Sequence, residues 1–136
     1  MNLRPRLVSF RVEAFSSDNR SEGEAAAWDI KLDNTIQIGV AVPTAPGQAI
    51  QGVVKLNLIA QARNTQTPDL TAAFRGDYAA RFVYPDGATE DAVSALVATE
   101  EHQYLLAAQA FPLAMSHFRR ELLAAGFEAS NLPLGL

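Results

Sequence analysis

The chain has 136 residues, of which 49% are hydrophobic and 19% are charged, and this size and composition predict one folded domain over residues 1–136. Its formal net charge is −4, and no run of lysine or arginine forms a stripe that could neutralise phosphates, so nucleic acid is not an expected partner. The absence of cysteine excludes disulfides, thiol catalysis and cysteine-ligated metals. No apolar run has the length of a secretory signal or a membrane span, so we expect a cytoplasmic protein without membrane insertion.

Four segments alternate apolar and polar side chains, which is the period of half-buried strands. The first places Val8, Phe10, Val12 and Ala14 on one face and is followed by a polar segment, Ser16–Gly23, that we expect to be a solvated loop. In the second segment the even positions from Trp28 to Val42 are mainly apolar. The remaining apolar rows are Val54, Leu56, Leu58, Ala60 and Ala62, and then Phe74, Gly76, Tyr78, Ala80, Phe82 and Tyr84. Four consecutive strands predict an antiparallel sheet.

The periodicity changes after Gly87, and an acidic stretch without a base, expected to be exposed, leads to a predicted helix. Thr99 is the predicted N-cap, with acidic residues in the first turn. Pro112 should kink or divide the helix, and Gly126 should end it. The residues predicted to cover the sheet are Tyr104, Ala108, Phe111, Met115, Phe118, Leu122 and Ala125. Further apolar residues surround the first half of this helix, so we expect a second subunit to cover it.

The sequence offers no catalytic constellation, cofactor motif or metal site. His102 and His117 are far apart in sequence and lack flanking ligands, and His117 is expected at the surface or an interface. The scattered glycines do not form a phosphate-binding loop, and the adjacent acids Glu100 and Glu101 suit the helix dipole better than acid–base catalysis. We therefore predict a protein that is not an enzyme and needs no cofactor.

Several short matches in chain order resemble the SecB family of export chaperones. They are Val8-Ser9-Phe10, Lys31-Leu32-Asp33, Phe111-Pro112, Gly126-Phe127 and Asn131-Leu132-Pro133-Leu134. The resemblance runs from Leu7 to Leu134, and it implies an α+β fold in which a four-stranded antiparallel sheet packs against a long C-terminal helix. It also implies a homo-oligomer, either a dimer or a dimer of dimers, that holds unfolded or nascent polypeptide without ATP.

Two departures separate this sequence from the export chaperones. No second long helix follows the proline-containing tail. The acids that the family uses to dock the SecA motor fall at Leu7 and Arg11, so the resemblance does not extend to SecA docking. SecB-like proteins also serve toxin–antitoxin systems and phages, and a dedicated antitoxin-type client fits this divergent chain better than secretory preproteins.

The predicted client contacts are apolar residues near the helix, the tail and the edge of the sheet. Each could instead belong to the core or to a subunit interface. They are Phe74, Tyr78, Phe111, Phe118, Leu122, Phe127, Leu132 and Leu134.

Two other functions remain open from the sequence. A sheet wrapped on one helix can enclose an apolar pocket, as in a carrier of small hydrophobic ligands. Alternatively, the helix could dock one folded partner, as in a structural adaptor subunit.

Overall fold

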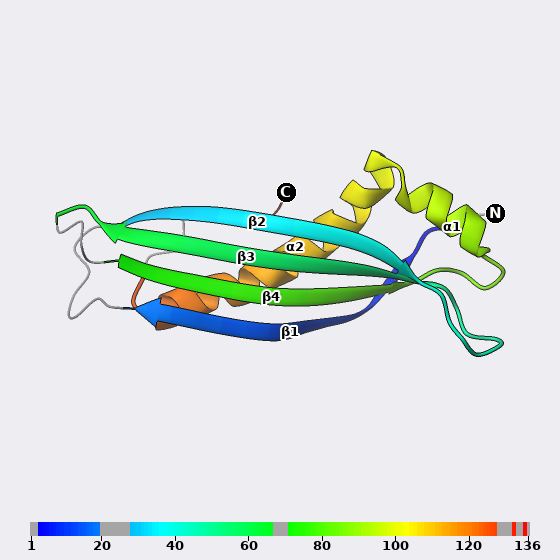
Figure 1. The fold of residues 1–136 in the computed structure, drawn as a ribbon, viewed down its shortest axis with the longest axis horizontal. Coiled ribbons are helices and arrows are strands. Elements are labelled where there is room, and N and C mark those ends of the chain that lie inside the picture. The colour runs from blue at the N-terminus through cyan, green and yellow to red at the C-terminus, as the bar shows by residue number, and fades with distance from the viewer. Residues whose placement is uncertain (1–2, 20–27, 67–70, 128–131, 133–134, 136) are drawn as a thin grey trace.

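The computed structural model describes residues 3–19, 28–66, 71–127, 132 and 135. Four strands are followed by two helices: β1 (Arg6–Asn19), β2 (Trp28–Ala41), β3 (Gln51–Asn64), β4 (Thr71–Val83), α1 (Glu90–Val97) and α2 (Glu100–Ala124). One antiparallel sheet forms the first layer, and α2 packs on one of its faces (Figure 1). The predicted α+β class, with an antiparallel sheet covered by a long helix, is confirmed.

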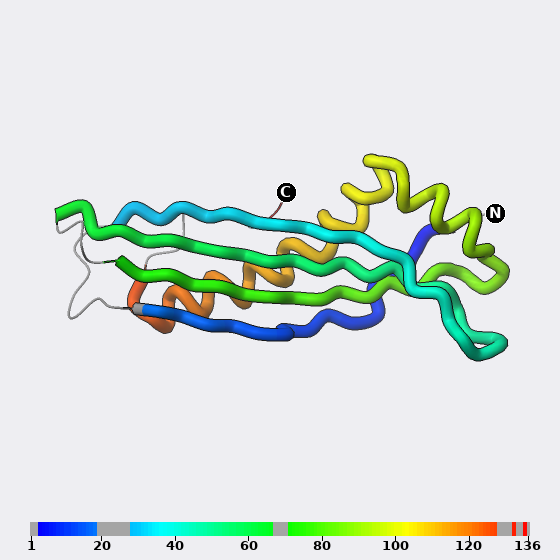
Figure 2. Tube along the Cα trace, viewed as in Figure 1, coloured from blue at the N-terminus to red at the C-terminus, as the bar shows by residue number. Residues whose placement is uncertain are grey.

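The strand order in the sheet is β1-β4-β3-β2, so β3 and β4 are central and β1 and β2 are the edges (Figure 2). The central strands bury every second side chain, as their sequence alternation predicted. Val54, Leu58 and Phe74 are at most 1% exposed and belong to the core between the sheet and α2. The opposite face of the sheet carries the charged and polar residues.

Strand β1 departs from the prediction because its register with β4 shifts twice, between Leu7 and Ser9 and between Val12 and Ala14. Each shift adds a residue to β1 and exchanges the faces of the residues that follow. Phe10 and Phe15 therefore pack on the core, whereas Val8 is 44% exposed and Ala14 lies opposite Asp77 on the outer face. The strand also continues through Ser16 to Asn19, which we had predicted to be loop. The remainder of that predicted loop lies outside the described residues.

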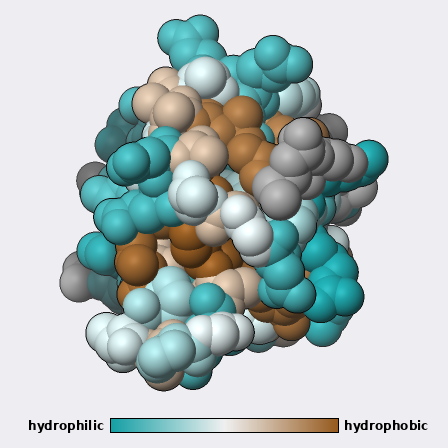
Figure 3. All heavy atoms as spheres, turned by 90° about the vertical axis from the view of Figure 1, so that its right-hand side faces the viewer, coloured by the Kyte–Doolittle hydropathy of each residue, from teal (hydrophilic) through white to brown (hydrophobic). Residues whose placement is uncertain are grey.

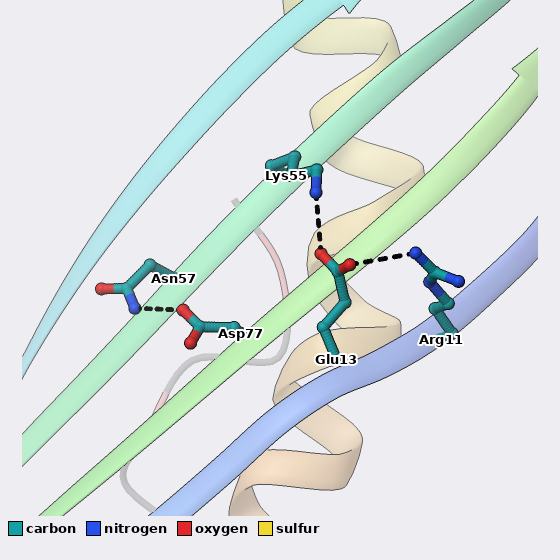
Figure 4. A network of polar contacts seen from close by, with 5 residues as sticks. All are labelled: Arg11, Glu13, Lys55, Asn57 and Asp77. Carbon is teal, nitrogen blue, oxygen red and sulfur yellow. Dashed lines mark hydrogen bonds and ion pairs between the residues drawn. The ribbon is translucent and has the colours of Figure 1, made fainter.

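Polar contacts on the outer face hold the irregular part of β1 against the sheet (Figure 4). Glu13, which lies at the second shift, accepts hydrogen bonds of 3.1 Å from both Lys55 and Arg11. The hydrogen bond from Lys55 is the main reason why the pKa of Glu13 is lowered. Nearby, the Asn57 side chain donates to Asp77 at 2.6 Å. The Lys55–Glu13 contact connects β1 to β3 across β4, whereas the Asn57–Asp77 contact joins β3 to β4.

Helix α2 begins and ends where the sequence predicted. The Thr99 hydroxyl accepts from the His102 backbone N–H, which makes Thr99 the N-cap. At the other end Gly126 has a φ of 91°, and the N–H of Phe127 donates to the Leu122 carbonyl. This is a Schellman motif, in which a glycine takes the left-handed conformation. Contrary to the prediction that Pro112 could divide the helix, α2 is continuous through it.

The face that α2 turns to the sheet was predicted correctly only from Phe111 onward. In the first turns the buried apolar residues are Leu106, Ala107 and Ala110, whereas the predicted Tyr104 is 59% exposed. This half of the helix is apolar around most of its circumference, so the periodicity alone does not select one face.

Helix α1 lies in the stretch that we had predicted only to be acidic and exposed. Thr89 caps it by accepting a hydrogen bond from the Ala92 N–H, and Glu90 and Asp91 occupy its first turn. Val93 and Val97 are buried with Ile50 and Tyr84 in a second, smaller apolar cluster. Ile38 and Val40 of β2 pack against this cluster, and α1 also contacts α2.

Candidate functional site

Most of the predicted client-contact residues lie inside the single chain. Phe74, Tyr78, Phe111, Phe118, Leu122 and Phe127 are at most 2% exposed, and all belong to the core between the sheet and α2. Leu132 is partly buried against the same core, and Leu134 lies outside the described residues. In this conformation the six buried side chains hold α2 on the sheet and are not accessible. Their role as client contacts remains a prediction.

One accessible surface that includes apolar residues lies beside the edge strand β2. We define the β2–α2 groove as the depression of about 320 Å³ lined by Ile36, Ile38, Glu100, Gln103, Tyr104 and Ala107. Ile36 and Ile38 are half-buried, and Tyr104 is among the most exposed large hydrophobic residues of the described chain. Of these residues, only Tyr104 belonged to the predicted helix stripe, where we had assigned it to the core.

The groove exists because α2 crosses the sheet diagonally (Figure 1). Its first turns lie near Ile36 and Ile38 of β2, whereas its later part reaches the opposite edge, where Phe118 contacts Phe15 of β1. One helix cannot cover both edges along their whole length. Every apolar side chain in the inward-facing row of β2 consequently remains half-buried: Trp28, Ile30, Leu32, Ile36, Ile38 and Val40.

The groove is lined by apolar residues of β2 and α2 and by the polar side chains of Glu100 and Gln103. Glu100 and Gln103 come from the first turn of α2, and the Gln103 side chain donates to the Val97 carbonyl at 2.8 Å. This bond connects the polar part of the groove to the end of α1. Seen from the end of the molecule where α1 lies, apolar side chains reach the surface in patches bordered by polar ones (Figure 3). Such a surface can take up apolar side chains, and it presents no nucleophile or acid–base pair.

An aromatic cluster lies at the opposite end of the core between the sheet and α2. The Phe127 ring packs edge-on against Trp28 at 4.9 Å and against Phe74 at 5.2 Å between ring centroids. Because Phe127 directly follows the glycine that ends α2, the Schellman motif sets this contact. The cluster anchors the end of the helix, and the described part of the tail, Leu132, packs nearby on the same core.

The two histidines of α2 contact tyrosines, Tyr78 in β4 and Tyr84 directly after it, and they do not lie in an exposed cleft. Tyr78 Oη is 2.9 Å from His117 Nδ1, and Tyr84 Oη is 2.7 Å from His102 Nε2. Burial raises the pKa of Tyr84 to about 12 and lowers the pKa of His102, so both groups are held neutral near pH 7. The His117 side chain is 23% exposed, and its ring packs against Tyr78 and Phe15 between the two layers, so its predicted place at the surface or an interface stays a prediction.

Two larger depressions lie on the polar face of the sheet. One of about 500 Å³ includes Glu13, Lys55, Asn57 and Asp77, whose side chains already contact one another. The other, of about 690 Å³, is lined by residues such as Asp29, Lys31 and Arg63. Among the described residues, no group of three or more histidine, aspartate or glutamate side chains could hold a metal ion. Nor does this part of the chain contain a helix with the length and apolarity needed to cross a membrane.

Comparison with solved structures identifies a similar architecture. The SecB-like chaperone Rv1957 of Mycobacterium tuberculosis, solved in complex with a ChAD peptide from the Rv1956 HigA1 antitoxin, superposes with a TM-score of 0.53. The match covers 98% of this chain and 88% of that chain at 20% sequence identity. The chain has the SecB-like fold. No protein-family model and no curated protein sequence matches the chain.

The SecB-like fold agrees with the structural part of the resemblance found in the sequence. At 20% identity the agreement concerns the arrangement of strands and helix.

Proposed function

We propose that the protein is an ATP-independent holdase chaperone that binds apolar segments of non-native polypeptide in the β2–α2 groove. The observation that supports this most directly is the open groove, where Ile36, Ile38 and Tyr104 offer apolar surface that α2 leaves uncovered. Burial of apolar surface contributes about 25 cal/mol per Å², so a client that buries a few hundred Å² gains several kcal/mol before its ordering costs. Such binding is reversible and requires no nucleotide.

The SecB-like fold supports the same proposal, because the similar chaperone Rv1957 was solved with a bound antitoxin peptide. We favour a dedicated client of this kind, held in the cytoplasm, over secretory preproteins. Leu7 packs on the core and Arg11 forms an ion pair with Glu13, so neither position provides the acid that SecA docking would need.

The active form in this proposal is a homo-oligomer. Helix α2 turns Leu105, Ala108 and Pro112 away from the sheet, and these side chains are only half-buried in the single chain. Leu113, beside them, is 38% exposed. A second subunit packed on this outer strip of α2 would cover it and leave the groove at the β2 edge open.

The test compares two substitutions on exposed apolar residues of the same helix. Tyr104→Glu puts a charge into the groove, whereas the control Leu123→Glu puts the same charge on a 55% exposed position outside it. Suppression of the aggregation of a chemically denatured test protein is followed by light scattering. We expect Tyr104→Glu to require about tenfold more chaperone for the same suppression, since burying a charge at the contact costs well over 1.4 kcal/mol. Leu123→Glu should act like the wild type.

The other two functions give different results in the same experiment. A carrier of small hydrophobic ligands would leave aggregation unchanged and would release a ligand on organic extraction, detected by mass spectrometry. A structural adaptor would leave aggregation unchanged and release nothing. Equal suppression by the wild type and Tyr104→Glu would show that the groove is not the client site.

A further inference from the structure

The edge of β2 beside the groove lacks the features that protect the other edge of the sheet. Exposed edge strands in natural proteins are protected by bulges, prolines or charges, which prevent another chain from pairing with them. Strand β1 has two register shifts and the Arg11–Glu13–Lys55 contacts. Strand β2 pairs with β3 without a shift from Trp28 to Ala41 and contains no proline.

The charges of β2 are confined to its first half. Asp29, Lys31 and Asp33 lie before Asn34, and the segment 34–41 has no charged residue. Its outward-facing side chains, Thr35 and Gln37, are followed by Gly39, beside which a Cβ would find no atom within 4 Å. This uncharged half of the edge also supplies Ile36 and Ile38 to the groove, and only its end is approached by α1, where Val40 packs against the small apolar cluster.

The helix layer extends beyond the sheet at the same place. In the view onto the sheet, the first turns of α2 lie past the outer edge of β2 (Figure 1). Tyr104 is on this part of α2 and lines the groove together with Ile36 and Ile38. A strand added about 4.8 Å from β2 would therefore lie under the helix, with alternate side chains turned toward Tyr104 and Ala107.

We propose that the client binds as an added β-strand, its backbone paired with residues 34–41 of β2 and every second side chain directed into the β2–α2 groove. The occupant is an extended segment with apolar residues at alternate positions. This inference rests on the proposed function and specifies how the client is held. Backbone pairing provides affinity that is independent of sequence, while the groove selects apolar side chains at alternate positions.

A second copy of the chain fits this edge less well than an extended client. Two copies of β2 could pair antiparallel along their whole length about a two-fold axis. Each residue would then lie opposite a residue whose side chain points to the same face of the sheet. Lys31 then meets Gln37 or Gly39, and no aspartate of β2 faces it. Such a pairing gains no cross-strand ion pair.

The experiment uses the full chain and a fluorescein-labelled peptide of alternating valine and threonine, about as long as segment 34–41. Two derivatives keep its side chains and carry N-methyl groups on alternate backbone amides, one derivative on the odd and the other on the even residues. In an added strand one set of amides faces β2 and the other faces solvent. We expect one derivative to bind like the parent peptide and the other about tenfold more weakly or worse, measured by fluorescence anisotropy.

Amide hydrogen exchange followed by NMR locates the added strand. We expect the parent peptide to slow exchange at every second amide of segment 34–41 and to leave β1 unchanged. Equal binding of the two derivatives, or slowed exchange in β1 in place of β2, would overturn strand addition while the holdase proposal stands. Failure of the parent peptide to bind would overturn both. Slow exchange at every second amide of segment 34–41 before the peptide is added, together with a doubled mass of the protein, would show that a second copy of the chain occupies the edge.

Discussion

Two glycines of the sheet lie beneath tyrosine rings of β4. A Cβ placed on Gly76 would come within 2.5 Å of Tyr78 Oη, and one on Gly52 would meet Tyr84 Cε2 at 3.3 Å. Each glycine gives the ring room to lie on the sheet while its hydroxyl reaches a histidine of α2. Neither glycine has a positive φ, so the space beneath the ring is the constraint, and it is much tighter at Gly76 than at Gly52.

Gly76→Ala should therefore destabilise the protein, by about 2 kcal/mol if the cost is that of overpacking a core. The matched control is Gly39→Ala in β2, where a Cβ meets no atom within 4 Å. That substitution should leave stability unchanged or raise it slightly, since glycine is a poor strand residue. Urea unfolding followed by circular dichroism measures both. Equal midpoints for the two variants would show that Tyr78 moves aside without cost.

At this scale the sequence predicted which residues of the central strands are buried but not what they contact. The alternation placed Phe74 and Tyr78 on one face correctly. It could not show that these side chains are fully covered by α2, because coverage depends on the angle at which the helix crosses the sheet. The residues that line the groove were missed for the same reason.

At the level of elements, the Tyr84–His102 contact joins the first turn of α2 to the end of the sheet, beside the small cluster of Ile50, Val93 and Val97. Burial lowers the pKa of His102 in the folded state. In the unfolded chain its pKa is near the ordinary value of about 6.5. The unfolded state therefore binds more protons below that pH, and acid favours unfolding.

We expect the stability of the wild type to be constant above about pH 7.5 and to fall as the pH decreases through about 6.5 toward the lowered folded-state pKa. The variant His102→Gln keeps a polar group near Tyr84 and removes the titration. It should lose less stability than the wild type between about pH 7.5 and about pH 5.5. Urea midpoints at several pH values provide the measurement. Parallel curves for the two proteins would exclude His102 as the source of the acid sensitivity.

The sequence predicted the two ends of α2 well, but it did not predict the register of β1 against β4. Thr99 and Gly126 act through their own side-chain or backbone conformation, so their roles could be predicted from sequence. The shifts in β1 depend on contacts with β4, which lies far along the chain. Helix α1 was missed because it is only 8 residues long and its first turn is acidic.

At the scale of the whole molecule, the outer strip of α2 is the surface that we expect a second subunit to cover. We expect the protein to sediment as a dimer or a larger oligomer. Leu113→Glu should shift it toward the monomer, raising the dissociation constant by about 100-fold, since a charge buried without a partner costs a few kcal/mol. The control Ala95→Glu adds the same charge at an exposed position of α1. Sedimentation equilibrium measures both. If the wild type sediments as a monomer, the proposal that the active form is a homo-oligomer is wrong.

The strand order also determines when each part of the protein can fold. Strands β2, β3 and β4 pair with their neighbours in sequence, so they can form as successive hairpins. Strand β1 pairs only with β4, and the paired residues lie far apart in sequence, from Arg6 with Val83 to Asn19 with Ala72. Such distant pairing closes a long loop and is slow. During synthesis the first strand therefore leaves the ribosome well before its partner exists. The protein that we propose to bind incomplete chains thus exposes an unpaired strand of its own until β4 has been made.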